Sequence, residues 1–300
     1  MLILFLISFL WGSSFIFGKL LLDNFSPEMI VTARFFIALV LFTAFYSKKI
    51  KLSKTLFRRG SIIGLINGLT LIVQFLGLKY TTPSNSAFLS ATYVLYVPLL
   101  EYFFWKRKIK RSIISSVLIS VLGVYFLSFT DLASFSMNRG DLITLICGFL
   151  FAFQIFFIGH YTRKENVYGL VFMQFSMSFF ASFIVLIGKF IFTNETLPEV
   201  SLIFDSEIIF NIMWLGIMCT LLPFALQFIA QKKVDPTVAG IVYLTEPVFA
   251  MILSFFIIGE TFSTQKIIGI LLILFGVVLA NNLKLRGIRS GIRDLLKKLD

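Results

Sequence analysis

A glutamate followed by a proline lies in the middle of a long apolar stretch near the end of the chain. Glu246 is the only acidic residue deep in such a stretch, and Pro247 lacks the backbone N–H that would bond the carbonyl of Tyr243. An ionised carboxylate in hydrocarbon costs roughly 2.5–3.5 kcal/mol, so Glu246 must face protein or water. Two interpretations stay open: Glu246 binds a proton or a substrate amine, or it is a protonated side chain that caps a kinked helix.

Arg34 is a second charged side chain inside an apolar stretch. It could extend to the membrane interface, bind a substrate carboxylate with both arms of its guanidinium, or form an ion pair with Glu246. Of these, we favour a structural or gating role, because intramembrane charges face the protein interior and its polar groups.

Polar side chains of two further kinds occur within apolar stretches. An amide in hydrocarbon needs a hydrogen-bond partner, and bonding between helices is favoured over substrate contact for the glutamines. Aromatic residues with a polar atom could line a path for amine-bearing solutes, although ordinary packing is the alternative for each one. The candidates are Gln74, Gln154, Gln174 and Gln227, and Trp11, Tyr93, Tyr96 and Tyr243.

Three prolines, Pro98, Pro223 and Pro247, are expected within membrane spans, where they could break helices or act as hinges. Glu101 lies close in sequence to Lys106 and Arg107, which predicts a local ion pair at the membrane surface without a role in transport.

The elements that position these residues follow from composition. The chain has 300 residues, of which 58% are hydrophobic and only 14% charged, so bilayer spans are required to accommodate its apolar surface. The continuous apolar runs predict an all-α membrane protein. Its ten helices are expected near 2–22, 27–46, 60–79, 84–104, 111–129, 140–161, 167–191, 207–231, 236–258 and 264–283. We interpret the first as a span and not as a cleaved signal peptide, because no basic segment precedes it.

Most of the 27 basic residues lie in alternate links between these runs. The positive-inside rule therefore places both termini in the cytoplasm and the chain in the cell membrane. Because the net charge of +12 is divided among short clusters, we expect no nucleic-acid partner. A single histidine and two cysteines within apolar runs argue against a metal site, a disulfide framework, a cofactor or an enzyme.

The chain also contains an internal repeat. A constant shift of 153 positions (227 − 74) places Gln74 on Gln227, and the same shift places Pro83 on Pro236. Five spans in each half is an odd number, so the second copy should run in the opposite sense. The predicted domains are 1–130 and 139–283, arranged around a central cavity, with a basic amphipathic cytoplasmic tail at 284–300.

Three motifs resemble those of the EamA-type transporters of the drug/metabolite transporter superfamily. They are Trp11-Gly12-Ser13-Ser14-Phe15, Arg34-Phe35-Phe36, and Glu246-Pro247-Val248-Phe249-Ala250 followed by Gly259-Glu260. The resemblance covers essentially the whole chain and implies transport of small metabolites or drugs without ATP hydrolysis. The chain departs from the family pattern in its first half, where Lys106-Arg107 replaces Gly-Glu and Tyr93-Val94 replaces Glu-Pro. The small multidrug pumps of the superfamily rely on a glutamate in their first span for two-proton exchange. The first span here has no acidic residue before Asp23 at its outer end, so we do not expect that mechanism in this protein.

We therefore expect a secondary transporter that exports a small metabolite, such as an amino acid or amine, by alternating access. The transport is either coupled to protons or uncoupled. The alternative is a translocase of a lipid or lipid-linked carrier from the same superfamily. Expected partners are a small-molecule substrate, protons in the coupled case, and the lipid bilayer, with the protein a monomer or homodimer.

Overall fold

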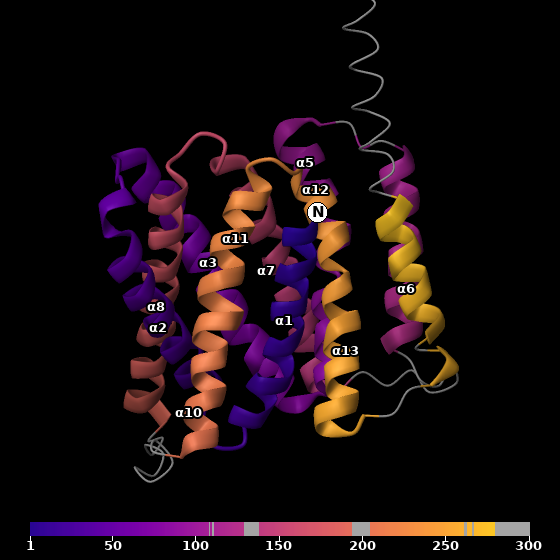
Figure 1. Ribbon diagram of the computed structural model, residues 1–300, viewed down its shortest axis with the longest axis horizontal. Coiled ribbons are helices and arrows are strands. Elements are labelled where there is room, and N and C mark those ends of the chain that lie inside the picture. Colours follow the sequence, from indigo (N-terminus) through magenta and orange to yellow (C-terminus); the bar gives the residue numbers. More distant parts are fainter. Residues whose placement is uncertain are drawn as a thin grey trace, which may run out of the picture.

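The computed structural model describes residues 1–107, 109, 111–128, 138–193, 205–260, 263–265 and 267–279. Throughout this part the regular structure is helical, and Figure 1 shows the long helices side by side. The elements are α1 (Leu2–Leu21), α2 (Pro27–Tyr46), η1 (Ser47–Lys49), α3 (Lys54–Tyr80), α4 (Pro83–Ser90), α5 (Tyr93–Trp105), α6 (Arg111–Ser128), α7 (Arg139–Tyr161), α8 (Val167–Thr193), α10 (Ser206–Met213), the π-helical η2 (Trp214–Leu221), α11 (Leu222–Gln231), α12 (Pro236–Tyr243) and α13 (Thr245–Ile258). A helix Ile267–Leu279 follows. The predicted tail at 284–300 lies outside the described residues.

Eight helical segments of the described chain are long and apolar enough to cross a membrane. Four of these combine consecutive elements: α2 with η1, α4 with α5, α10 with η2 and α11, and α12 with α13. The two remaining predicted spans coincide with shorter apolar helices, Ile113–Gly123 and Ile267–Leu279. The prediction of an all-helical, multi-pass membrane protein is confirmed.

The distribution of side chains fits a lipid environment. Phe192 and Phe256 point outward, 86% and 76% exposed, while Arg34 and Gln174 are buried. So many large apolar side chains on the surface are not expected of a water-soluble domain and are typical of a surface solvated by lipid.

Proline and capping residues explain where several helices begin. Pro27, Pro83 and Pro236 each occupy the first turn of a helix after a residue in extended conformation. A proline is favourable there because its missing N–H would have no partner inside the helix.

Two spans are broken in the middle, and the breaks match. Ala91 directly follows α4 (φ −65°, ψ −7°), and Leu244 directly follows α12 (φ −61°, ψ −9°). Both second parts end in a left-handed residue, Lys106 (φ 52°) after α5 and Gly259 (φ 79°) after α13. Members of each pair are separated by the 153 positions of the sequence repeat. Only glycine adopts this conformation without strain, so Lys106 is the less favourable of the two.

The helix breaks lie upstream of the prolines proposed as hinges. Pro98 is inside α5, and Pro247 is in the first turn of α13. Pro223 is in the first turn of α11, directly after the π-helical segment η2.

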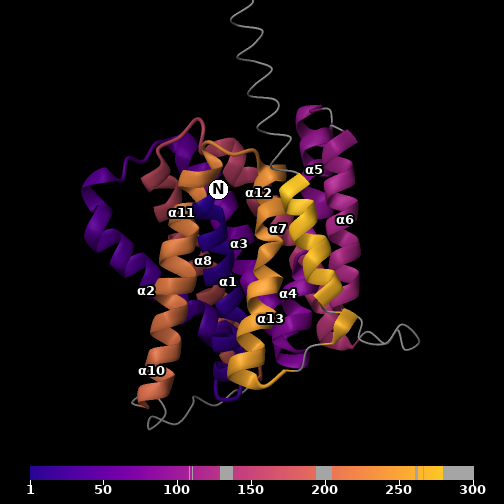
Figure 2. The same cartoon turned by 45° about the vertical axis from the view of Figure 1, so that its right-hand side comes forward.

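Packing is closest where helices meet through glycines. A Cβ on Gly68 of α3 would lie 2.9 Å from the backbone of Ser178 on α8. α3 packs along α7 and α8, α2 along α8 and η2, and α1 along α13, α11 and η2. In Figures 1 and 2, α1 lies in the middle of the bundle beside α13. These contacts bring the middle of α1 to the break between α12 and α13.

Candidate functional site

The first motif places the backbone of α1 directly against α13. A Cβ on Gly12 would lie 2.9 Å from the carbonyl oxygen of Glu246 and 3.0 Å from the amide nitrogen of Ala250. Because a backbone group cannot move aside as a side chain can, only glycine permits this approach. The contact brings Trp11 to the broken span.

Aromatic rings from several helices meet around Trp11. The centroid of its ring lies 5.1 Å from that of Tyr243 on α12, 5.3 Å from Phe224 on α11 and 6.3 Å from Phe151 on α7. Tyr93 at the start of α5 packs on the other side of Phe151, with centroids 6.3 Å apart. The two halves of the chain therefore both contribute to one aromatic cluster.

Several polar atoms of this cluster have no partner among the described residues. They are Nε1 of Trp11 and the hydroxyl oxygens of Tyr93 and Tyr243, all buried. Glu246 is 6% exposed, lies within electrostatic reach of both tyrosines, and makes no hydrogen bond or ion pair within the described chain. We call Trp11, Tyr93, Tyr243 and Glu246 the Glu246 cluster. A buried unsatisfied polar group costs about 1–3 kcal/mol, so three such atoms beside the Glu246 carboxyl indicate a position for a ligand or proton.

The other candidates from the sequence lie apart from this cluster or are already bonded. Tyr96 packs edge-on against Phe149 of α7. Gln154 and Gln227 bond each other reciprocally between α7 and α11, at 3.1 and 3.3 Å, as expected for bonding between helices. Both amide atoms of buried Gln174 lack a partner in the described part, and Gln74 makes no hydrogen bond there.

Arg34 is 1% exposed and does not extend to the membrane interface. Its Nε donates to Thr220 Oγ1 at 2.7 Å, its Nη1 to Ser14 Oγ at 3.2 Å, and its Nη2 to the carbonyl of Cys219 at 2.9 Å. Pro223 cannot supply the N–H that would bond this carbonyl in a regular helix. Within the described chain Arg34 has no ion pair with Glu246. These contacts favour the structural role that we expected.

The predicted local pair of Glu101 is confirmed, but its predicted position at the surface is wrong. Its pair with Arg107 exists, at 3.1 Å, but Glu101 is only 9% exposed. Its second oxygen accepts a hydrogen bond from Thr237, in the first turn of α12. Sequence reasoning missed this contact because the two residues are far apart in the chain. The available signal was the repeat, in which Thr237 is the counterpart of Ser84.

Ser84 makes the equivalent contact at the other end of the bundle, where its hydroxyl donates to Glu260, just after α13. Figures 1 and 2 show the start of α12 at one end and the end of α13 at the opposite end. At each end, a hydroxyl in the first turn of a short helix in one half bonds a carboxylate of the other half.

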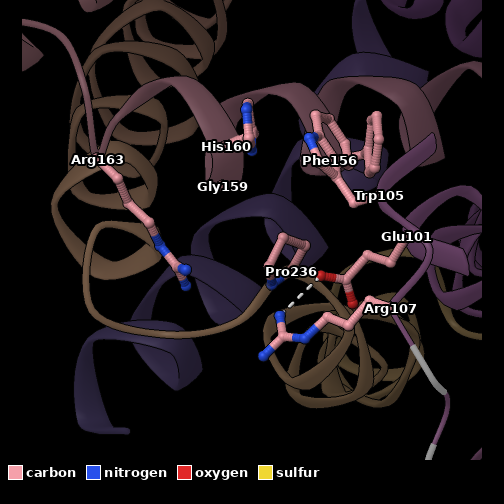
Figure 3. Close-up of a pocket in the computed structure, with 8 residues that line it drawn as sticks. All are labelled: Glu101, Trp105, Arg107, Phe156, Gly159, His160, Arg163 and Pro236. Carbon is pink, nitrogen blue, oxygen red and sulfur yellow. Dashed lines mark hydrogen bonds and ion pairs between the residues drawn. The ribbon is translucent and has the colours of Figure 1, made fainter.

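A cavity of about 250 Å³ lies beside Glu101, between the ends of α5, α7 and the start of α12. Figure 3 shows its lining residues, Glu101, Trp105, Arg107, Phe156, Gly159, His160, Arg163 and Pro236. The Trp105 ring lies 3.9 Å from both Phe156 and His160, measured between centroids. No sequence motif indicated this cavity.

An ion-pair network borders the cavity. Asp235 binds Arg107 at 3.1 Å and Arg163 at 2.8 Å. Partial burial raises the pKa of the Asp235 carboxyl, but hydrogen bonds from Arg163 and Arg107 outweigh it and hold that pKa below its ordinary value. Burial lowers the pKa of Arg107, and the hydrogen bonds and charges of Asp235 and Glu101 raise it above the ordinary value. We call this end of the molecule the basic end.

Comparison with known proteins agrees with the fold. A solved crystal structure of another protein superposes with a TM-score of 0.75 at 17% identity, over 95% of this chain and 97% of that one. An uncharacterized transporter of Archaeoglobus fulgidus is 30% identical, over 92% of this chain and 83% of its own length. The uncharacterized transporter YetK of Bacillus subtilis is 25% identical, over 89% and 82%.

Membrane-length helices and relatives of this kind define a multi-pass membrane transporter. The profile of the EamA-like transporter family matches residues 1–129 and again 138–282. The chain belongs to this family.

Proposed function

We propose that the protein is a secondary transporter that exports a small metabolite, such as an amino acid or an amine, by alternating access. The Glu246 cluster carries this proposal. Its carboxylate, two hydroxyls and indole N–H are buried, unpartnered within the described chain, and contributed by both halves. These groups suit a solute with an amine and an apolar part, through hydrogen bonds and cation–π contacts.

We further propose that the ten spans form two inverted repeats of five. Support comes from the matching helix breaks and left-handed helix ends at a shift of 153, and from the double match of the family profile. The packing is also reciprocal: α1 of the first half packs on α11 and α13, and α7 of the second half packs on α3, α4 and α5.

Alternating access requires that each end of the bundle can close. The contacts of Thr237 with Glu101 and of Ser84 with Glu260 join the two halves at opposite ends and supply such closures. A rocking motion of the halves would break one contact while the other remains. The clustering of basic residues favours a cytoplasmic position for the basic end and for both termini.

Glu246 is the group proposed to couple transport to protons. Without an ion pair in the described chain, its charge is not held by a fixed partner, so a proton or a substrate amine can neutralise it. If Glu246 binds a proton and a substrate amine in turn, the protein exchanges protons for substrate across the membrane.

Transport by the purified protein in liposomes tests the proposal, with a panel of labelled amino acids and amines and an imposed proton gradient. Glu246→Gln should reduce gradient-driven accumulation at least 10-fold, while Glu165→Gln should leave it unchanged, because Glu165 pairs with Arg59 and is not part of the Glu246 cluster. Absence of transport for every solute at every gradient would contradict a small-metabolite carrier. Movement of a labelled lipid in the same liposomes would favour a lipid translocase instead.

A further inference from the structure

We propose that the cavity at the basic end is a binding site for a small zwitterion, a group that carries both an ammonium and a carboxylate or phosphate. This inference goes beyond the proposed function, because the site is separate from the Glu246 cluster. It rests on the charged side chains that border the cavity and on the hydrogen bonds and ion pairs that these side chains make.

The charges around the cavity are of both signs and close together. Glu101 and Asp235 are acidic, and Arg107 and Arg163 are basic, with Lys164 at the rim beside His160. A simple anion in the cavity would lie beside the like charge of Glu101, and a simple cation would lie beside the arginines, and both contacts are unfavourable. A zwitterion can place each of its charges against the opposite one.

The cavity has a hydrogen-bonding group for each end of such a ligand: Arg163 for the anionic end and Glu101 for the ammonium. Within the described residues Arg163 donates one hydrogen bond, from Nη2 to Asp235, so further N–H donors of its guanidinium are free for an anionic group. Figure 3 shows Arg163 and the Glu101–Arg107 pair on either side of Pro236. Glu101 accepts one bond from the neutral hydroxyl of Thr237, and an ammonium group is the stronger donor.

The size and walls of the cavity limit the ligand further. About 250 Å³ is below the ~300–1,000 Å³ of pockets for drug-sized ligands, so a small molecule or a single headgroup fits. Trp105 and Phe156 provide an apolar wall. An ammonium that replaced Thr237 at Glu101 would also break one of the contacts between the two halves at this end, where the Arg107–Asp235 pair is another.

Tryptophan fluorescence of the full-length protein in nanodiscs tests this site, because Trp105 lines it. The probes are phenylalanine, phenethylamine, which lacks the carboxylate, and 3-phenylpropionate, which lacks the ammonium. Nanodiscs of phosphatidylglycerol with or without phosphatidylethanolamine distinguish a free zwitterion from a lipid headgroup. We expect a saturable change with phenylalanine, with phosphatidylethanolamine, or with both, that is lost in Trp105→Phe, and at least 10-fold weaker responses to the two analogues.

Matched variants identify the groups involved. Arg163→Gln and Glu101→Gln should each weaken the response at least 10-fold, and Glu165→Gln on the same face should not. Equal responses to all three soluble probes, or no Trp105-dependent response to either zwitterion source, would overturn the site. Glu246→Gln should leave the response intact. A Trp105 response without liposome transport would therefore refute the proposed function alone, and transport without this response would refute the site alone.

Discussion

Arg34 is a buried cation whose hydrogen bonds within the described chain all go to neutral groups. Its planar guanidinium reaches Ser14 on α1 and Thr220 and Cys219 in η2, and lies 5.5 Å from the centre of the Phe75 ring. One side chain on α2 thereby joins three other elements. Arg34 therefore holds the π-helical segment η2 in place. Such segments are rare in proteins overall, and many of those that occur lie at functional sites.

Replacement of Arg34 tests this role. Arg34→Lys keeps the charge but cannot reach three acceptors with one ammonium group, so the protein should lose about 2 kcal/mol or more of stability. The midpoint of thermal unfolding in detergent measures the effect. Arg58→Lys, at an exposed position on α3, is the control and should be neutral. Equal midpoints for the two variants would contradict the proposed anchoring role.

The ionisation of Asp235 should make the stability of the folded protein depend on pH. Because Arg163 and Arg107 hold its pKa below the ordinary value, the contribution of the ionised carboxylate is complete above about pH 3.9, the ordinary pKa in an unfolded chain. That contribution disappears as the pH falls through the lower pKa of the folded state. The difference in melting temperature between wild type and Asp235→Asn should be constant from pH 8 to pH 5 and should shrink below about pH 4. A difference that grows under acid conditions would refute this assignment.

At the scale of the elements, each broken span is packed closely against a helix of the other half of the chain. Gly12 on α1 touches α13 just after its break, and Gly148 on α7 meets the backbone of Ser90 at the end of α4. Each break is therefore covered by a glycine on a helix from the other half of the chain. Larger residues at these positions would separate the halves.

A pair of glycine substitutions measures this effect. Gly12→Ala should force α1 away from α13, which we expect to destabilise the protein by roughly 1–3 kcal/mol and to reduce transport. Gly188→Ala in α8 is the matched control, since a Cβ there meets nothing within 4 Å. It should be neutral or stabilising by about 0.5–1 kcal/mol, through helix propensity. Thermal unfolding and liposome transport are measured for both variants. A Gly12→Ala protein with unchanged stability and transport would contradict the proposed need for close approach of α1 to α13.

At the scale of the whole molecule, the repeat implies that equivalent residues lie on opposite sides of the membrane. Lys79 and Lys232 are separated by the 153 positions of the repeat, and both are exposed. The two native cysteines, Cys147 and Cys219, are buried, and serine can replace them in a labelling background.

Labelling from the two sides tests this topology. In intact cells a membrane-impermeant maleimide should label Lys79→Cys, whereas Lys232→Cys should be labelled only after permeabilisation. Labelling of both residues from the same side would exclude the inverted arrangement. Labelling from opposite sides in the reverse order would preserve the repeat and overturn the orientation.

The positions of the helices could be predicted from the sequence because hydropathy, prolines and capping residues act over short distances. The predicted spans at 27–46 and 236–258 coincide with α2 and with α12 and α13, and the repeat shift reproduces the breaks at Ala91 and Leu244. Glu246 was identified for a similar reason, since a carboxylate in an apolar run is unfavourable wherever the helix packs.

The partners of each side chain were decided only by the tertiary structure. The bond between Thr237 and Glu101, the bonds of Arg34 to Thr220 and Cys219, and the cavity beside Trp105 each join segments that are far apart in the chain. Such contacts depend on the rotation and spacing of packed helices, which apolar runs that are hydrophobic on every face do not encode. The sequence alone therefore determined the membrane class, the spans and the repeat, whereas helix packing determined which polar groups meet and which remain without a partner in the described chain.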